Sequence, residues 1–131
     1  MLFRSVLGLD AQAKMVHGSR DNLACFLDGG WDVVCGDARS LPLADGAVDA
    51  VVFDAPYGRQ SKIEGRLDEL VVAALEEARR VAPRCVVVGD RPWARAASAA
   101  GWTTTTQRGA TRCASASADK SRSSIFPSIF D

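Results

Sequence analysis

Hydrophobic residues in this chain form short continuous runs that are separated by stretches of helical periodicity. The runs predict four buried strands, at residues 5–10, 31–37, 48–54 and 84–90. In two of the intervening stretches, apolar side chains recur at spacings of three and four, which is typical of amphipathic helices. Strands that alternate with helices favour a parallel, doubly wound α/β sheet. Continuous apolar strands also fit a sheet that is covered on both faces.

The predicted helices are delimited by residues that end helices. The first begins at Ala11 and stops at Gly29–Gly30, the second is closed by Pro83, and a short third helix, Pro92–Ala100, is capped by Gly101. We expect one face of each of the two longer helices to be buried. That face comprises Met15, Val16, Ser19, Leu23, Phe26 and Leu27 in the first helix, and Leu67, Leu70, Val71, Ala74, Leu75, Ala78, Val81 and Ala82 in the second.

The last part of the chain has a different composition. Trp102–Thr106 is β-prone. Residues 108–131 have a centre rich in Ser, Ala and Arg and no clear period. The pattern therefore divides the chain into a partial α/β domain, residues 1–107, and an irregular tail, residues 108–131.

Composition narrows the class of protein. The 131 residues suggest one small domain, and 16 basic against 16 acidic residues do not suggest strong, non-specific nucleic-acid binding. No apolar run approaches the roughly 20 residues that span a bilayer, so we expect a soluble cytoplasmic protein. With a single histidine and no Cys-x-x-Cys pair, we expect no metal site. The cysteines are interpreted as buried free thiols: Cys25, Cys35, Cys85 and Cys113.

Three of the predicted strands end in an aspartate: Asp10, Asp37 and Asp54. Ligands bind beyond the carboxyl ends of the strands in open α/β sheets, so these acids suggest one shared pocket. Asp10 could accept hydrogen bonds from ribose hydroxyls, and helix capping is the alternative. Asp37 could accept a hydrogen bond from an adenine amine, while the Ala38 amide donates one to an adenine ring nitrogen. The alternative for Asp37 is an ordinary turn residue.

The segment Asp54-Ala55-Pro56-Tyr57 carries the sharpest chemical signal. An exocyclic purine amine is a poor nucleophile because its lone pair is delocalised into the ring. The Asp54 carboxylate and the Ala55 carbonyl are candidate acceptors for its hydrogens. Pro56 would stiffen the turn, and Tyr57 offers a ring on which a flipped base can stack.

Basic residues follow this segment in a polar stretch. Beside a base pocket, Arg59, Lys62 and Arg66 could contact phosphates, and solvated loop charges are an equally good interpretation. Other enzyme classes find less support. The sequence contains no Gly-x-Gly-x-x-Gly dinucleotide motif and no recognisable nucleophile–His–acid arrangement.

Together these motifs resemble those of a known family. The matching segments, residues 7–16, 36–43, 52–62 and 89–93, share its order and spacing over residues 5–105. The sequence is similar to the archaeal tRNA (guanine-10) N2-methyltransferases, particularly their haloarchaeal members. The resemblance implies a Rossmann-like class I methyltransferase domain behind an RNA-binding THUMP domain. It also implies that S-adenosylmethionine is the methyl donor and that guanine N2 in tRNA is the acceptor.

The resemblance assigns roles to the candidate residues. Asp10 would bind the cofactor ribose, and Asp37 with Ala38 the adenine. Asp54 would face both cofactor and substrate in an Asp-Pro-Pro-Tyr-type catalytic motif with Pro56 and Tyr57. Ala55 replaces the first proline of that motif, which need not abolish activity because the carbonyl of this residue is the acceptor.

Three features of the family are missing from the sequence: the THUMP domain, the first strand with its Gly-rich loop, and the closing hairpin. We expect a sheet without its first strand, which would lie between the strands that end at Asp10 and Asp54. A separate THUMP-containing or N-terminal half is a possible partner. An adenine-N6 methyltransferase, an rRNA guanine-N2 methyltransferase and a non-catalytic fragment of such an enzyme remain alternatives.

Overall fold

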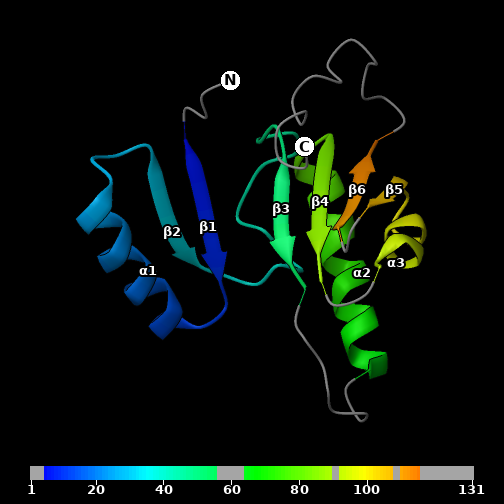
Figure 1. The fold of residues 1–131 in the computed structure, drawn as a ribbon, viewed down its shortest axis with the longest axis horizontal. Helices are drawn as coiled ribbons and strands as arrows, with labels where there is room; N and C mark the ends of the chain where they lie inside the picture. The colour runs from blue at the N-terminus through cyan, green and yellow to red at the C-terminus, as the bar shows by residue number, and fades with distance from the viewer. Residues whose placement is uncertain (1–4, 56–63, 90–91, 108–109, 116–131) are drawn as a thin grey trace. The chain divides into compact units, whose positions relative to one another are not determined.

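The computed structural model describes residues 5–55, 64–89, 92–107 and 110–115. The chain divides into two compact units, Met1–Pro42 and Leu43–Asp131. The elements run β1 (Val6–Asp10), α1 (Ala13–Phe26), β2 (Trp31–Cys35), β3 (Val51–Asp54), α2 (Glu64–Val81), β4 (Arg84–Val88), α3 (Ala94–Ala99), β5 (Thr103–Gln107) and β6 (Ala110–Ala114) (Figure 1). This alternation of strands and helices confirms the predicted α/β fold.

The first unit is a β-α-β unit. Strands β1 and β2 are parallel, with Asp10 opposite Cys35 at their carboxyl ends. Arg20 ties α1 to β2, because its Nε donates a hydrogen bond to the Val33 carbonyl at 2.8 Å. Gly30 has a φ of 77°, a conformation that favours glycine, so the predicted glycine turn lies between α1 and β2.

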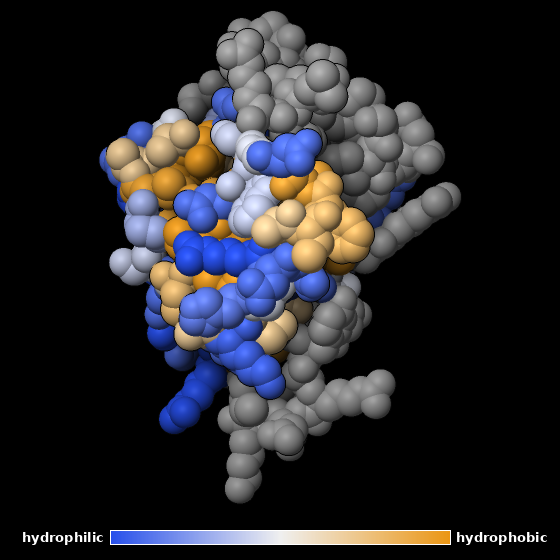
Figure 2. Space-filling model, turned by 90° about the vertical axis from the view of Figure 1, so that its left-hand side faces the viewer, coloured by the Kyte–Doolittle hydropathy of each residue, from blue (hydrophilic) through white to orange (hydrophobic). Residues whose placement is uncertain are grey.

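The predicted buried face of α1 is only partly correct. Val16 is buried and Leu23 half-buried, two helical turns apart. Met15, Phe26 and Leu27 are 51%, 84% and 49% exposed, so for them the prediction is wrong. A helix that covers a two-stranded sheet contacts it along a narrow stripe, and the flanking apolar residues stay in solvent. Figure 2 shows the resulting mixture of hydrophilic and hydrophobic residues on the face where α1 lies.

The second unit contains a four-stranded sheet in the order β3-β4-β6-β5 (Figure 1). Strands β3 and β4 are parallel, and β6 is antiparallel to both β4 and β5. The prediction of an irregular tail from residue 108 is therefore wrong for residues 110–114, and a boundary at residue 107 cuts through the β5–β6 hairpin. Strand β6, with the sequence Ala-Thr-Arg-Cys-Ala, has no apolar run and is held by ladders on both sides, so no periodicity in the sequence predicts it. Residues 116–131 lie outside the described part of the chain.

The core of the second unit lies between α2, α3 and the sheet. Apart from Leu70, all the predicted apolar positions of the second helix are buried. The Trp102 indole is also buried, and its Nε1 donates to the Leu75 carbonyl at 2.9 Å, which joins the start of β5 to α2. Gly101, with a φ of 90°, ends α3 as predicted.

The cysteines are not all buried, contrary to the interpretation of the sequence. Cys85 and Cys113 are buried and face each other across the β4–β6 ladder, whereas Cys25 and Cys35 are exposed. Cys35 is exposed because it ends a strand in a sheet of only two strands. The hydrogen bond with Cys113, together with burial, raises the pKa of the Cys85 thiol.

This difference in burial predicts the reactivity of the thiols. Cys25 and Cys35 should react with an aromatic disulfide reagent in the native protein, because the reagent reaches them and the thiolate is the attacking form. Cys85 and Cys113 should react only after unfolding. The double variant Cys25→Ser/Cys35→Ser is the control and should lose the rapid phase. Rapid reaction of that variant would contradict the burial of Cys85 and Cys113.

Candidate functional site

Asp10 and Asp37 lie at the same edge of the sheet in the first unit. Strand β1 ends at Asp10, opposite the last residue of β2, and the Gly36 amide donates to the Asp10 carbonyl at 3.0 Å. Asp37 follows directly and accepts through its carbonyl from the Ser40 amide at 3.0 Å, which closes a turn. Parallel pairing thus brings both predicted cofactor acids to one carboxyl edge, where α/β folds bind ligands.

The Asp10 carboxylate is half-buried and accepts a hydrogen bond from the backbone directly before α1. Its Oδ1 accepts a hydrogen bond from the Gln12 amide at 2.8 Å. No other group in the described part of the chain donates to this carboxylate. The bond to Gln12 fits the capping interpretation of Asp10, and its role toward a cofactor ribose stays a prediction.

The Asp37 carboxylate is engaged by Arg39, which the sequence analysis did not identify. Oδ1 accepts from the Arg39 amide at 2.8 Å, and the guanidinium reaches both oxygens, with Nη2 2.7 Å from Oδ2. These hydrogen bonds lower the pKa of Asp37 to about 2. A carboxylate can accept about four hydrogen bonds, one at each lone-pair position. An adenine amine would therefore either share the Asp37 carboxylate with Arg39 or displace one of the Arg39 N–H groups. The spacing Asp-x-Arg is the only sequence signal for this pair, and it is weak.

The ion pair predicts the titration of Asp37. In a ¹H–¹³C NMR titration its carboxyl should have a midpoint near pH 2, below its ordinary value of 3.8. Arg39→Ala should return the midpoint toward that ordinary value. Because the pKa of the folded state is the lower one, the pair's contribution to stability is present above about pH 4 and is lost as the pH falls toward 2. An unshifted Asp37 in the parent protein would contradict the pairing.

In the second unit, Asp54 and Ala55 lie at the carboxyl end of β3. The Asp54 side chain is exposed, and the residue is opposite Val88 of β4. Ala55 is 1% exposed, and its amide donates to the Val88 carbonyl at 2.8 Å. Proline has no amide hydrogen, so the proline that this family resemblance expects at residue 55 could not make that bond. The alanine thus ties the turn to β4.

The other predicted site residues divide between the two units or fall outside the description. Ala38 is exposed in the first unit, and Arg66 is exposed near the start of α2 in the second. Pro56, Tyr57, Arg59 and Lys62 lie outside the described residues, and their roles stay predictions. The single pocket for Asp10, Asp37 and Asp54 also stays a prediction, because it joins residues of both units.

Two further properties bear on the class of site. Among the described residues, no three His, Cys, Asp or Glu side chains group closely enough to hold a metal ion. Within the same residues, no helix combines the length and the apolar character needed to cross a membrane.

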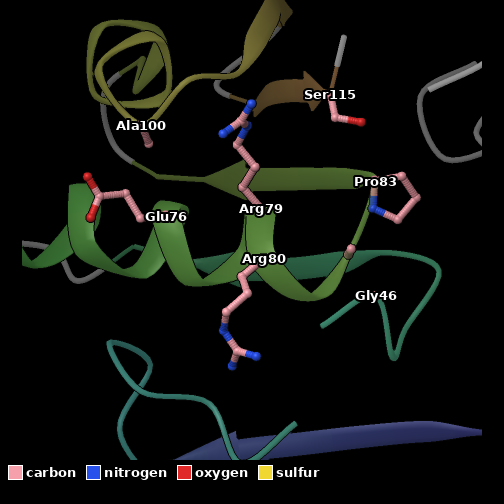
Figure 3. Close-up of a pocket in the computed structure, with 8 residues that line it drawn as sticks. Gly46, Glu76, Arg79, Arg80, Pro83, Ala100 and Ser115 are labelled. Carbon is pink, nitrogen blue, oxygen red and sulfur yellow. The ribbon is translucent and has the colours of Figure 1, made fainter. Parts of the chain in front are cut away.

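A hollow of about 570 Å³ lies elsewhere in the second unit (Figure 3). Pro83 directly before β4 and Ser115 directly after β6 line it, together with Arg79 and Arg80 at the end of α2. Asp54 ends β3, which is parallel to β4, so this hollow is at the opposite end of the sheet from Asp54. It is therefore not part of the predicted methyltransferase site.

The fold defines the class of protein. Its elements superpose on a SAM-dependent methyltransferase from Aquifex aeolicus with a TM-score of 0.62, at 19% identity over 83% of this chain and 66% of that chain. The [4+2]-cyclase SpnF superposes with a TM-score of 0.55, at 20% identity over 78% of this chain and 44% of that chain. These likenesses establish the Rossmann-like class I methyltransferase fold, and the cyclase shows that the fold alone does not decide the reaction.

The sequence then places the chain within that class. Residues 2–115 match the RMKL-like methyltransferase domain, and the chain belongs to this family. Over 64 residues it is 41% identical to a tRNA (guanine(10)-N2)-dimethyltransferase of Methanothermobacter thermautotrophicus. That match covers 49% of this chain and 19% of the relative.

Proposed function

We propose that this domain transfers a methyl group from S-adenosylmethionine to the exocyclic N2 amine of guanine in tRNA. The observation that carries the proposal is the Asp54–Ala55 turn. It presents an exposed carboxylate beside a backbone carbonyl whose residue is buried and tied to Val88. The similarity to a tRNA guanine-N2 methyltransferase favours guanine as the base and tRNA as the substrate.

The chemistry follows from the groups at this turn. S-adenosylmethionine, when bound, supplies an electrophilic methyl group. The Asp54 carboxylate accepts a hydrogen bond from one N–H of the amine and the Ala55 carbonyl from the other, which directs the nitrogen lone pair away from both acceptors. As the bond from nitrogen to the methyl carbon forms, the bond from that carbon to the donor sulfur would break. The amine would lose one proton to the exposed Asp54 carboxylate, which returns it to solvent. Asp10 Oδ2 binds a ribose hydroxyl, and the turn of Asp37 and Ala38 contacts the adenine. Tyr57 stacks on the flipped guanine, and Pro56 stiffens the turn between Ala55 and Tyr57.

Phosphates of the RNA are the proposed partners of the basic residues after the turn. Arg59, Lys62 and Arg66 would neutralise backbone charge beside the base pocket and so position the RNA without reading its sequence. The exposed side chain of Arg66 near the start of α2 is compatible with this role.

The proposal is tested by incubating the chain, together with the N-terminal half of a related enzyme, with methyl-labelled S-adenosylmethionine and a tRNA transcript, followed by digestion to nucleosides. Label in N2-methylguanosine or its dimethylated form supports the proposal. Label in N6-methyladenosine, or label only when rRNA replaces tRNA, would instead favour the alternative substrates. A transcript in which the methylated guanine is replaced by adenine is the matched control. No incorporation at saturating cofactor would overturn the proposed activity.

We also propose that a separate, THUMP-containing N-terminal half completes this domain. In the described part of the chain, β1 pairs only with β2, and β3 pairs only with β4. Each strand thus has an open edge, and Val6, Leu7 and Val52 are 56%, 41% and 63% exposed. Apolar parallel strands are normally paired on both sides and covered, so a strand supplied by the other half would bury this surface.

The open edges predict weak cofactor binding by this chain alone. Isothermal calorimetry should give a dissociation constant for S-adenosylmethionine above the micromolar range, because, among the described residues, the strands that carry Asp10 and Asp54 each have a neighbour on one side only. Adding the N-terminal half of a related enzyme should tighten binding. Micromolar binding together with methyl transfer by the chain alone would contradict this prediction.

A further inference from the structure

Gly89, directly after β4, makes room for the side chain of Trp93 next to the Asp54–Ala55 turn. A Cβ atom added at Gly89 would lie 2.5 Å from Trp93 Nε1, 3.1 Å from Trp93 Cδ1 and 3.6 Å from the Cβ of Ala55. A side chain at residue 89 would therefore collide with the indole. Because residue 89 has no side chain, the indole of Trp93 and the Cβ of Ala55 can both approach the backbone at the end of β4.

Trp93 is held in place by elements on both sides of it. Its backbone amide donates to Oγ1 of Thr111 at 3.2 Å, and Thr111 on β6 is fully buried. Its carbonyl accepts from the Ala97 amide at 2.9 Å, which begins α3. The residue is 3% exposed and belongs to the same core cluster as Ala55. The backbone of Trp93 is thus anchored by α3 and β6, and its side chain is buried in the core.

Ala55 is consequently constrained from two directions. Its amide is bonded to the Val88 carbonyl, and its Cβ faces the space shared by Gly89 and the indole. In the proposed function, the Ala55 carbonyl accepts a hydrogen bond from the amine of the base. Misplacement of a reacting group by about 1 Å can reduce a rate on the order of 10²-fold, so the fixation of this residue has a catalytic consequence.

We infer that Trp93 is a positioning residue for methyl transfer: its backbone is anchored through Thr111, and its indole, for which Gly89 leaves room, fixes Ala55 so that the Ala55 carbonyl has one direction. The inference rests on the proposed function. In this inference Trp93 acts through Ala55. Gly89 is required for its size, and Thr111 for its hydroxyl.

Single-turnover methyl transfer at saturating cofactor and RNA tests the inference. Trp93→Ala should lower the rate on the order of 10²-fold, and Trp93→Phe should recover most of it, because a flat ring still fills the space. Gly89→Ala should also lower the rate, because its methyl group displaces the indole. Gly18→Ala is the matched control, since a Cβ at Gly18 meets nothing within 4 Å. Parent-like rates in Trp93→Ala or Gly89→Ala would overturn the inference.

Amide hydrogen exchange, measured by NMR on the same variants, separates positioning from general stability. Trp93→Ala and Gly89→Ala should speed exchange of the Ala55 amide more than exchange of a core amide such as that of Leu75. Equal acceleration of both amides, or an unchanged Ala55 amide, would overturn the inference. This measurement needs no activity. If the parent chain transfers no methyl group even when an N-terminal half is added, the proposed function fails while the exchange experiment still decides the role of Trp93.

Discussion

Asp54→Ala should lower single-turnover methyl transfer on the order of 10²-fold or more. The carboxylate ends β3 in an exposed position next to Ala55, where it can accept an amine hydrogen. Alanine removes that acceptor and leaves the strand pairing intact. The rate should be measured at saturating S-adenosylmethionine with a tRNA transcript, so that weaker binding by the variant does not disguise the chemical step.

Two comparisons make the Asp54 experiment specific. Asp49→Ala removes another exposed acid, just before β3, and should leave the rate unchanged. Asp54→Ala itself should change the free energy of unfolding by no more than about 0.5 kcal/mol, as is usual for an exposed side chain. A parent-like rate in Asp54→Ala would remove this carboxylate from the mechanism.

Leu75→Ala should lower the free energy of unfolding by about 2–5 kcal/mol. The side chain is fully buried in the core between α2 and the sheet, and the carbonyl of the same residue accepts the Trp102 indole hydrogen. Truncation leaves a cavity at this junction of α2 and β5. A small domain has a total stability of about 5–15 kcal/mol, so the loss is a large fraction of it.

Urea denaturation followed by circular dichroism measures this effect. Leu70→Ala on the same helix is the matched control, because Leu70 is 36% exposed and its truncation leaves no internal cavity. It should shift stability by no more than about 0.5 kcal/mol. Equal denaturation midpoints for Leu75→Ala and Leu70→Ala would show that the core does not lie where the structure places it.

The elements that the sequence predicted best are those whose burial pattern is local. Helix α2 spans Glu64–Val81, and its apolar residues recur at the spacing that one buried face requires, so the buried side follows from the sequence. Strands β1 and β4 are continuous apolar runs that end at the expected positions within one or two residues. For these segments the side chains themselves specify the period, whatever the neighbouring elements are.

Other features depend on neighbours that no local pattern reveals. The pattern on α1 places Met15 and Phe26 on the apolar face, yet only a narrow stripe contacts the two-stranded sheet and both residues are exposed. Strand β6, Ala110–Ala114, lacks the valine run of β4 and forms because β4 and β5 each supply a ladder to it. Tertiary pairing outweighs its weak intrinsic preference.

The candidate site shows the same division. The sequence by itself determined that Asp10 and Asp54 stand at the ends of strands, because each closes a run of apolar residues. Only the tertiary structure decided what surrounds the other site residues. The Arg39 guanidinium is bonded to Asp37, and the Trp93 indole and Ala55 both lie close to Gly89. The indole and the Cβ of Ala55 both lie close to the position of a Cβ at Gly89, and this arrangement depends on the packing of β3, β4 and α3 together. Position along a strand is a local property, whereas contact across strands is set by the whole fold.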